Sequence, residues 1–211
     1  MARRHISSRP RSDTRCRVSW EATPAGSAVT EASTTTSHGG HDLGFWLLTL
    51  NVRFKENVGG LIRVASNFGA SGVVLVGQGS YRRAAALGLE ASVPLRRFDT
   101  PEEALQWLVG ERLFLVAAER TGHSVPIHQA SWPESRLCFA VGSEREGLPA
   151  TFLDNADRLV DVPMYGQSAS MNLAVAAAVF SFEHVRRLGF PPRPDLNISG
   201  RRNGWNPKTW G

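Results

Sequence analysis

One stretch, residues 137–187, constrains the fold of this chain more than any other part of its sequence. Leu137 to Val141 is an apolar run followed by a glycine, which is typical of a buried strand. A second strand is predicted over Arg158 to Val162, and an apolar helix is predicted from about Met171 to Arg187. Ligands of open α/β sheets bind where strand ends meet helix N-termini, so we expect a ligand site among these three elements.

Strands and helices also alternate upstream of this stretch. Apolar runs predict four further strands, over Phe45 to Leu50, Val73 to Val76, Leu95 to Phe98 and Leu113 to Ala117. The segment from Thr121 to Trp132 is predicted to be a loop. Such alternation indicates an α/β fold with a mostly parallel sheet and helices on both of its faces.

Capping and turn residues predict where the intervening helices begin. Asn57 is a good N-cap for a helix that ends at a glycine. One face of that helix is apolar and comprises Val58, Leu61, Ile62, Ala65 and Phe68. Thr100, followed by a proline and two acidic residues, predicts a helix that ends near Val109. Shorter helices are predicted over Arg82 to Leu89 and near Pro149.

Length and composition favour one folded domain with two tails. The chain has 211 residues, of which 42% are hydrophobic, and we divide it into a flexible tail (1–40), a folded domain (41–190) and a second flexible tail (191–211). The sequence contains no run of eighteen apolar residues, so we predict no membrane span. Cys16 lies in a polar tail and Cys138 in a predicted buried strand, so we expect no disulfide and a reducing, cytoplasmic location. The six histidines show no metal-ligand spacing with the cysteines, and we predict no metal.

The positive charge is concentrated in the two tails. The net charge of the chain is +5, yet residues 1–40 carry +3, residues 41–190 carry −1 and residues 191–211 carry +3. Basic tails are suited to holding a polyanion such as RNA. The alternative is compositional bias, because only Lys55 and Lys208 are lysines and every other cation is arginine.

Three short motifs resemble those of the SpoU/TrmH branch of the SPOUT RNA methyltransferases. The first comprises Asn57, Gly59, Arg63 and the Phe68-Gly69-Ala70 triplet. The second comprises Gly142-Ser143-Glu144, and the third comprises Val162-Pro163-Met164 with Ser170-Met171-Asn172-Leu173-Ala174. Each motif alone is weak, but all three occur in the family's order between Phe45 and Arg187.

The resemblance implies a fold, a reaction and partners that periodicity does not show. It implies a deep C-terminal trefoil knot and a homodimer that works on tRNA or rRNA. It further implies that S-adenosylmethionine (SAM) donates a methyl group to a ribose 2′-OH. The alternatives are a non-catalytic RNA-binding relative, or a nucleotide-binding α/β protein. The latter is poorly supported, because Tyr81 and Arg82 stand where a dinucleotide fingerprint needs a third glycine.

The resemblance also assigns roles to individual residues. Arg63 is the expected catalytic residue, either as the base for the 2′-OH or as a cation that stabilises the developing alkoxide, with Asn57 in the same motif. A guanidinium is a poor base at neutral pH, which leaves both roles open. Glu144 is expected to orient Arg63 or the substrate, and Ser170 and Asn172 are expected to position ribose and phosphate. Cofactor contacts are expected from Gly142, Val162, Met164, Met171 and Leu173.

Three residues in or beside the second and third motifs have further consequences. Ser170 is also a plausible N-cap for the last helix, which would place Asn172 in its first turn. Met171 replaces the leucine usual in the family, a swap of similar volume that should preserve the cofactor slot. Arg145 stands where many relatives have glycine, so this loop is expected to contact the substrate differently.

Overall fold

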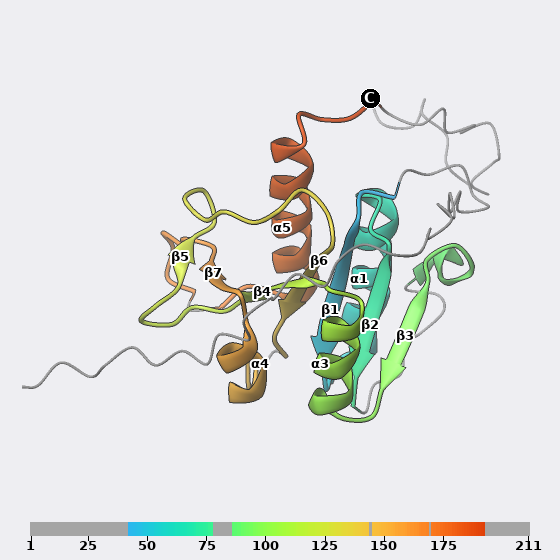
Figure 1. Ribbon diagram of the computed structural model, residues 1–211, viewed down its shortest axis with the longest axis horizontal. Helices are drawn as coiled ribbons and strands as arrows, with labels where there is room; N and C mark the ends of the chain where they lie inside the picture. Colours follow the sequence, from blue (N-terminus) through green and yellow to red (C-terminus); the bar gives the residue numbers. More distant parts are fainter. Residues whose placement is uncertain (1–41, 78–85, 144, 169, 193–211) are drawn as a thin grey trace, which may run out of the picture. The chain divides into compact units, whose positions relative to one another are not determined.

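The strands of the described residues form one seven-stranded sheet in which every pairing is parallel. This computed structural model describes residues 42–77, 86–143, 145–168 and 170–192. The spatial order of the strands is β3-β2-β1-β6-β4-β7-β5 (Figure 1). Their bounds are β1 Phe45–Leu50, β2 Gly72–Val76, β3 Leu95–Phe98, β4 Phe114–Ala118, β5 Val125–Pro126, β6 Leu137–Val141 and β7 Arg158–Asp161.

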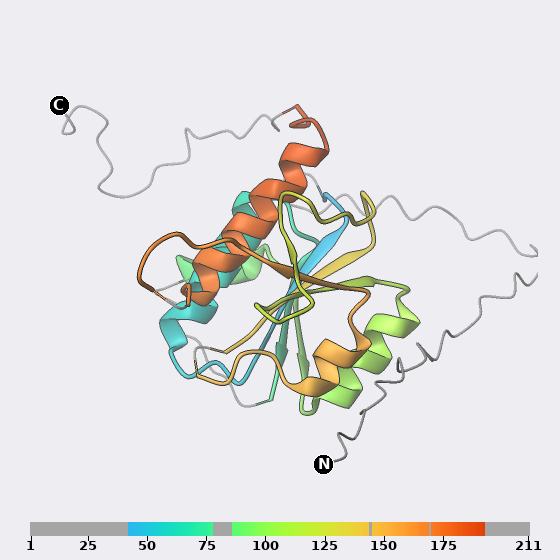
Figure 2. The same ribbon diagram turned by 90° about the vertical axis from the view of Figure 1, so that its left-hand side faces the viewer.

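Helices cover both faces of this sheet, as predicted (Figure 2). The helices α1 (Lys55–Asn67) and α5 (Leu173–Arg187) pack on one face, and α3 (Pro101–Gly110) and α4 (Ala150–Asn155) pack on the other. A short 3-10 helix, η1 (Leu89–Ala91), precedes β3. Layers of this kind bury both faces of a parallel sheet, which explains why its strands have nearly continuous apolar sequences.

Alternate residues of the central strands supply two separate cores. On β6, Phe139 faces the α1/α5 side, whereas Cys138 and Ala140 face the α3/α4 side. The Phe139 ring lies 5.7 Å from that of Phe45 and 5.6 Å from that of Phe180, measured between ring centroids. Because these rings are fully or almost fully buried, they fix α5 against the centre of the sheet.

Most predicted strands are confirmed, with small shifts at their ends. β1, β3 and β6 have the predicted bounds, β2 begins one residue earlier, β4 lies one residue later and β7 ends one residue earlier. The prediction that residues 121–132 form only a loop was wrong, because this segment contains β5. A two-residue strand has no sequence period, so only its pairing with β7 reveals it. The helix predicted over 82–89 lies largely outside the described residues.

The helix starts were predicted with mixed success. Thr100 caps α3 as predicted, because its Oγ1 accepts a hydrogen bond from the Glu103 N–H at 3.3 Å. The N-cap of α1 is Phe54, and Asn57 lies in the first turn, so the predicted cap was wrong. The Phe54 carbonyl accepts the Asn57 N–H at 2.9 Å, and the helix begins three residues earlier than expected.

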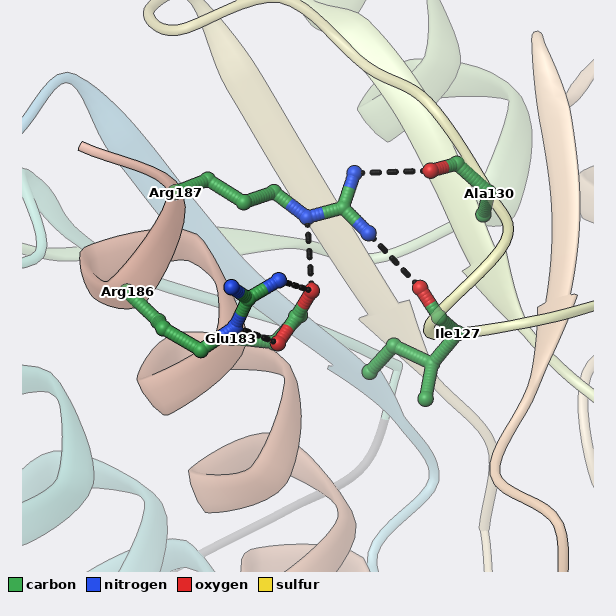
Figure 3. Close-up of polar contacts among 5 residues, drawn as sticks. All are labelled: Ile127, Ala130, Glu183, Arg186 and Arg187. Atoms are coloured by element: carbon green, nitrogen blue, oxygen red, sulfur yellow. Dashed lines mark hydrogen bonds and ion pairs between the residues drawn. The ribbon is translucent and has the colours of Figure 1, made fainter. Parts of the chain in front are cut away.

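Arg187 ties the end of α5 to the loop between β5 and β6 (Figure 3). Its guanidinium donates to the carbonyl oxygens of Ala130 and Ile127, each at 2.7 Å, and to the Glu183 carboxylate at 2.8 Å. The guanidinium carbon also lies 3.8 Å from the ring centroid of Trp132. A planar fork that satisfies two carbonyls and a carboxylate while stacking on indole is a role that lysine cannot fill.

Within the described part of the chain, no helix is long and apolar enough to cross a membrane. The two basic tails lie outside the described residues, apart from residues 191 and 192, so the division into 1–40, 41–190 and 191–211 stays a prediction.

Candidate active site

A cleft of about 370 Å³ opens at the carboxyl ends of β4, β6 and β7, beside the start of α5. This is the place where the strand and helix pattern predicted a ligand site. All five predicted cofactor residues line it: Gly142, Val162, Met164, Met171 and Leu173. Ser170 and Asn172 line it as well. Residues that are thirty positions apart in sequence therefore meet on one surface.

The turn after β6 forms one wall of the cleft, and at Gly142 that wall consists of main chain. Ser143 and Gly147 exchange two backbone hydrogen bonds, at 3.2 and 3.1 Å. A Cβ on Gly142 would lie 2.6 Å from the Gly147 Cα and 2.7 Å from the Leu148 nitrogen. Position 142 therefore requires glycine, and the wall there presents bare peptide groups to a ligand.

Asn172 caps α5 and joins the first motif to the third. Its Oδ1 accepts the N–H groups of Ala174 and Val175, at 2.9 and 3.3 Å. Its Nδ2 donates to the Oδ1 of Asn57 at 3.0 Å. The prediction that Ser170 caps this helix was wrong, because the chain enters the helix only at Asn172. The Ser170 carbonyl instead accepts the Ser168 hydroxyl at 2.7 Å.

The predicted catalytic residues are only partly brought together. Asn57, Asn172 and Ser170 lie at or beside the start of α5. Arg63 is exposed on α1 and is not among the described residues that line the cleft. Glu144 lies outside the described residues, so its relation to Arg63 stays a prediction.

Four charged residues of the cleft were not singled out as site residues from the sequence. Glu119 and Arg120 follow β4, Asp161 ends β7, and Arg145 belongs to the turn after β6. Arg145 was noted only as a departure from the family pattern. Among the residues that the structure describes, the cleft thus carries two acids and two arginines, in contrast to the uniformly basic groove that charge alone would predict for an RNA site.

His184 belongs to the core rather than to this site. It is 1% exposed, its ring packs against Phe45 and Phe139, and its Nε2 lies 3.3 Å from the Leu43 carbonyl oxygen. Burial lowers the pKa of His184 below its usual value. No cluster of three potential metal ligands occurs among the residues that the structure describes.

Comparison with known families shows which family has this sequence pattern. The model of the SpoU rRNA Methylase family matches residues 44–182, which is more than half of the chain. The chain belongs to this family. The match covers all three motifs and every element from β1 to most of α5, so the resemblance predicted from the motifs is confirmed.

The chain is similar to proteins that are named as RNA methyltransferases. The chain is 34% identical over 147 residues to an uncharacterised tRNA/rRNA methyltransferase of Synechocystis, covering 67% of this chain and 38% of that protein. It is 29% identical over 153 residues to the 23S rRNA (guanosine-2′-O-)-methyltransferase RlmB of Salmonella typhi, covering 70% of this chain and 62% of RlmB. The chain therefore spans less than two thirds of the length of either relative.

A solved structure of the family has the same fold. The SAM-bound rRNA methyltransferase of Sinorhizobium meliloti superposes with a TM-score of 0.63 at 28% identity, covering 70% of this chain and 59% of that one. The predicted α/β fold of the SPOUT type is thereby confirmed, while the trefoil knot itself stays a prediction.

Proposed function

We propose that this chain transfers a methyl group from SAM to a ribose 2′-OH of RNA. The single observation that carries the proposal is the cleft, on which all five residues expected to contact the cofactor meet. Family membership and the names of the relatives support the same reaction. The substrate is a tRNA or an rRNA.

The residues of the cleft fit SAM. The volume of the cleft falls in the usual range for small-molecule sites, about 300–1,000 Å³. Val162, Met164 and Met171 offer apolar contacts to an adenine ring, and the glycine at position 142 exposes peptide groups for its polar edge. SAM supplies an electrophilic methyl group, so the protein needs only to orient donor and hydroxyl and to manage one proton.

The motif residues carry out this orientation. Ser170 and Asn172 hold the ribose and phosphate beside the start of α5, and the bond from Asn172 to Asn57 fixes the Asn172 amide. Arg63 stabilises the charge that develops on the 2′-oxygen or accepts its proton, and Glu144 orients Arg63 or the substrate. Each of these roles follows the family motif at the matching position.

We also propose that the protein is a cytoplasmic homodimer, the commonest symmetric assembly. The α5 residues Leu173, Ala177 and Phe180 are buried in the core of a single copy, so they are not available to a second copy. Val175 and Phe182, on the same helix, are 51% and 50% exposed. Light scattering at micromolar concentration should give twice the mass of 23.0 kDa. A monomer mass would contradict this part of the proposal.

Methyl transfer from labelled SAM to total RNA tests the function. The wild-type protein should label RNA but not protein or DNA. A Met171→Trp variant should lose SAM binding in calorimetry, because the added bulk fills the cleft, whereas Met171→Leu should retain it. RNA binding without methyl transfer by the wild type would favour the non-catalytic alternative. Absence of both would exclude the proposal.

A further inference from the structure

We propose that Glu119 is a positioning residue that holds the turn from Gly142 to Leu148 and, through it, the wall of the SAM cleft. This inference rests on the function proposed above. Glu119 follows β4 directly and lies outside the three motifs. It is half-buried and lines the cleft. No pattern in the sequence assigned it a role.

Glu119 connects three strand ends through two hydrogen bonds. Its carboxylate Oε2 accepts the backbone N–H of Leu148 at 3.0 Å, which ties the end of β4 to the turn after β6. Its own N–H donates to the Val160 carbonyl at 3.1 Å, which ties the same residue to β7. A hydrogen bond from an amide to a carboxylate is stronger than one between neutral groups, so it is suited to fixing an exposed turn.

The turn is built around this carboxylate. Gly147 has φ +65°, a conformation that favours glycine, and a Cβ there would lie 2.5 Å from the Glu119 Oε2. Gly147 in turn packs against Gly142, where a Cβ would lie 2.6 Å from the Gly147 Cα. The carboxylate, Gly147 and Gly142 are therefore in successive contact, and all three residues line the cleft.

The hydrogen bond between Leu148 and Glu119 should stabilise the turn and not the whole fold. Leu148 is 4% exposed and its side chain packs with Phe152 in the α3/α4 core, which anchors one side of the turn independently. The Glu119 carboxylate anchors the backbone on the cleft side. Loss of this second anchor should open the turn locally while the sheet remains folded. SAM affinity should then fall, whereas methyl transfer at saturating SAM should change little.

Three substitutions of Glu119 distinguish the effect of side-chain length from that of charge. Glu119→Gln keeps an oxygen acceptor of the same length, Glu119→Asp keeps the charge but withdraws it by one methylene, and Glu119→Ala removes both. Glu111→Ala, which changes an exposed glutamate at the C-cap of α3, is the matched control. The first readout is backbone amide exchange at Leu148 in the full chain without SAM. The second is SAM affinity by calorimetry, with KM for SAM and kcat measured alongside.

We expect the Ala and Asp variants to speed exchange at Leu148 by about tenfold or more and to weaken SAM binding by about tenfold, the loss of one charged hydrogen bond. The Gln variant should recover most of both effects, and exchange in β1 should not change. Exchange and affinity within twofold of wild type in both the Ala and Asp variants would overturn the proposal. So would a Gln variant that protects Leu148 yet binds SAM as weakly as Ala does, because the charge would then contact SAM directly. If the wild type binds no SAM, the proposed function fails, and the exchange measurement still decides whether Glu119 holds the turn.

Discussion

Arg63 offers the clearest test of catalytic chemistry, because it is exposed on α1 and its loss leaves the core intact. We predict that Arg63→Ala lowers kcat about 100- to 1,000-fold, the usual cost of losing one group that stabilises developing charge. SAM affinity should stay near that of wild type, since Arg63 is not among the described residues lining the cleft. Arg63→Lys should recover only part of the rate, because it lacks the planar fork. A rate for Arg63→Ala within threefold of wild type would exclude this role.

Residues that belong to the three motifs were found from the sequence, and Glu119, which lies outside them, was not. Gly142, Val162 and Met171 were predicted because their motif spacing is distinctive, and they do meet on one cleft. Glu119 was missed because its partner is a main-chain N–H 29 residues away, which leaves no trace in side-chain spacing. Ser170 was wrongly chosen as a cap because serine and asparagine cap equally well, and only the path of the chain selects Asn172.

At the scale of elements, the sequence predicted the sheet well because parallel strands are buried on both faces and so appear as apolar runs. β1 and β6 were placed to the residue on this signal. The order of the strands could not be deduced in the same way, since it depends on contacts between elements far apart in the chain. β5 was missed for a related reason, because its two residues form a strand only by pairing with β7.

The Arg187 contacts should stabilise the packing of α5 against the loop between β5 and β6 (Figure 3). We predict that Arg187→Ala lowers the free energy of unfolding by about 2 kcal/mol, because two carbonyls lose a charged donor. Arg187→Lys should be only partly tolerated. Arg186→Ala is the matched control, since Arg186 also pairs with Glu183 but from an exposed position, and it should leave stability nearly unchanged. Equal effects of Arg186→Ala and Arg187→Ala in denaturant titrations would contradict this account.

The same cluster should make stability depend on pH in acid. Hydrogen bonds from Arg186 and Arg187 lower the pKa of Glu183 to about 2, from an ordinary value of 4.5. The native state then holds this carboxylate ionised at pH values where the unfolded chain binds a proton. The contribution of Glu183 is therefore complete above about pH 4.5 and is lost as the pH falls towards 2.

Comparison with Glu183→Gln isolates this contribution, because all other carboxylates cancel in the difference. The difference in unfolding free energy between the two proteins should be constant above about pH 5 and should shrink below it. A difference that does not vary between pH 6 and pH 3 would show that the ion pairs contribute nothing to stability.

For the whole molecule, we predict that the tails contribute to RNA affinity, because the predicted folded domain, residues 41–190, carries −1 and the two tails carry the surplus positive charge. If residues 1–40 contact three phosphates, their removal should flatten the slope of log K against log salt by roughly 2, at ~0.7 for each phosphate of single-stranded RNA. KM for RNA should rise while kcat stays the same, since the proposed catalytic residues lie outside the tail. Equal slopes for the full chain and a protein beginning at His41 would mean that the arginines reflect compositional bias.

The position of the transferred methyl group tests the central proposal most directly. RNA labelled by the full chain with methyl-labelled SAM should be hydrolysed in alkali, which requires a free 2′-OH to cleave the adjoining phosphodiester. If the methyl group is on the ribose oxygen, the label should remain in alkali-resistant dinucleotides, and RNA treated with Arg63→Ala should carry little of it. Label recovered in mononucleotides with methylated bases would contradict 2′-O-methylation, even if the protein proved to be an RNA methyltransferase.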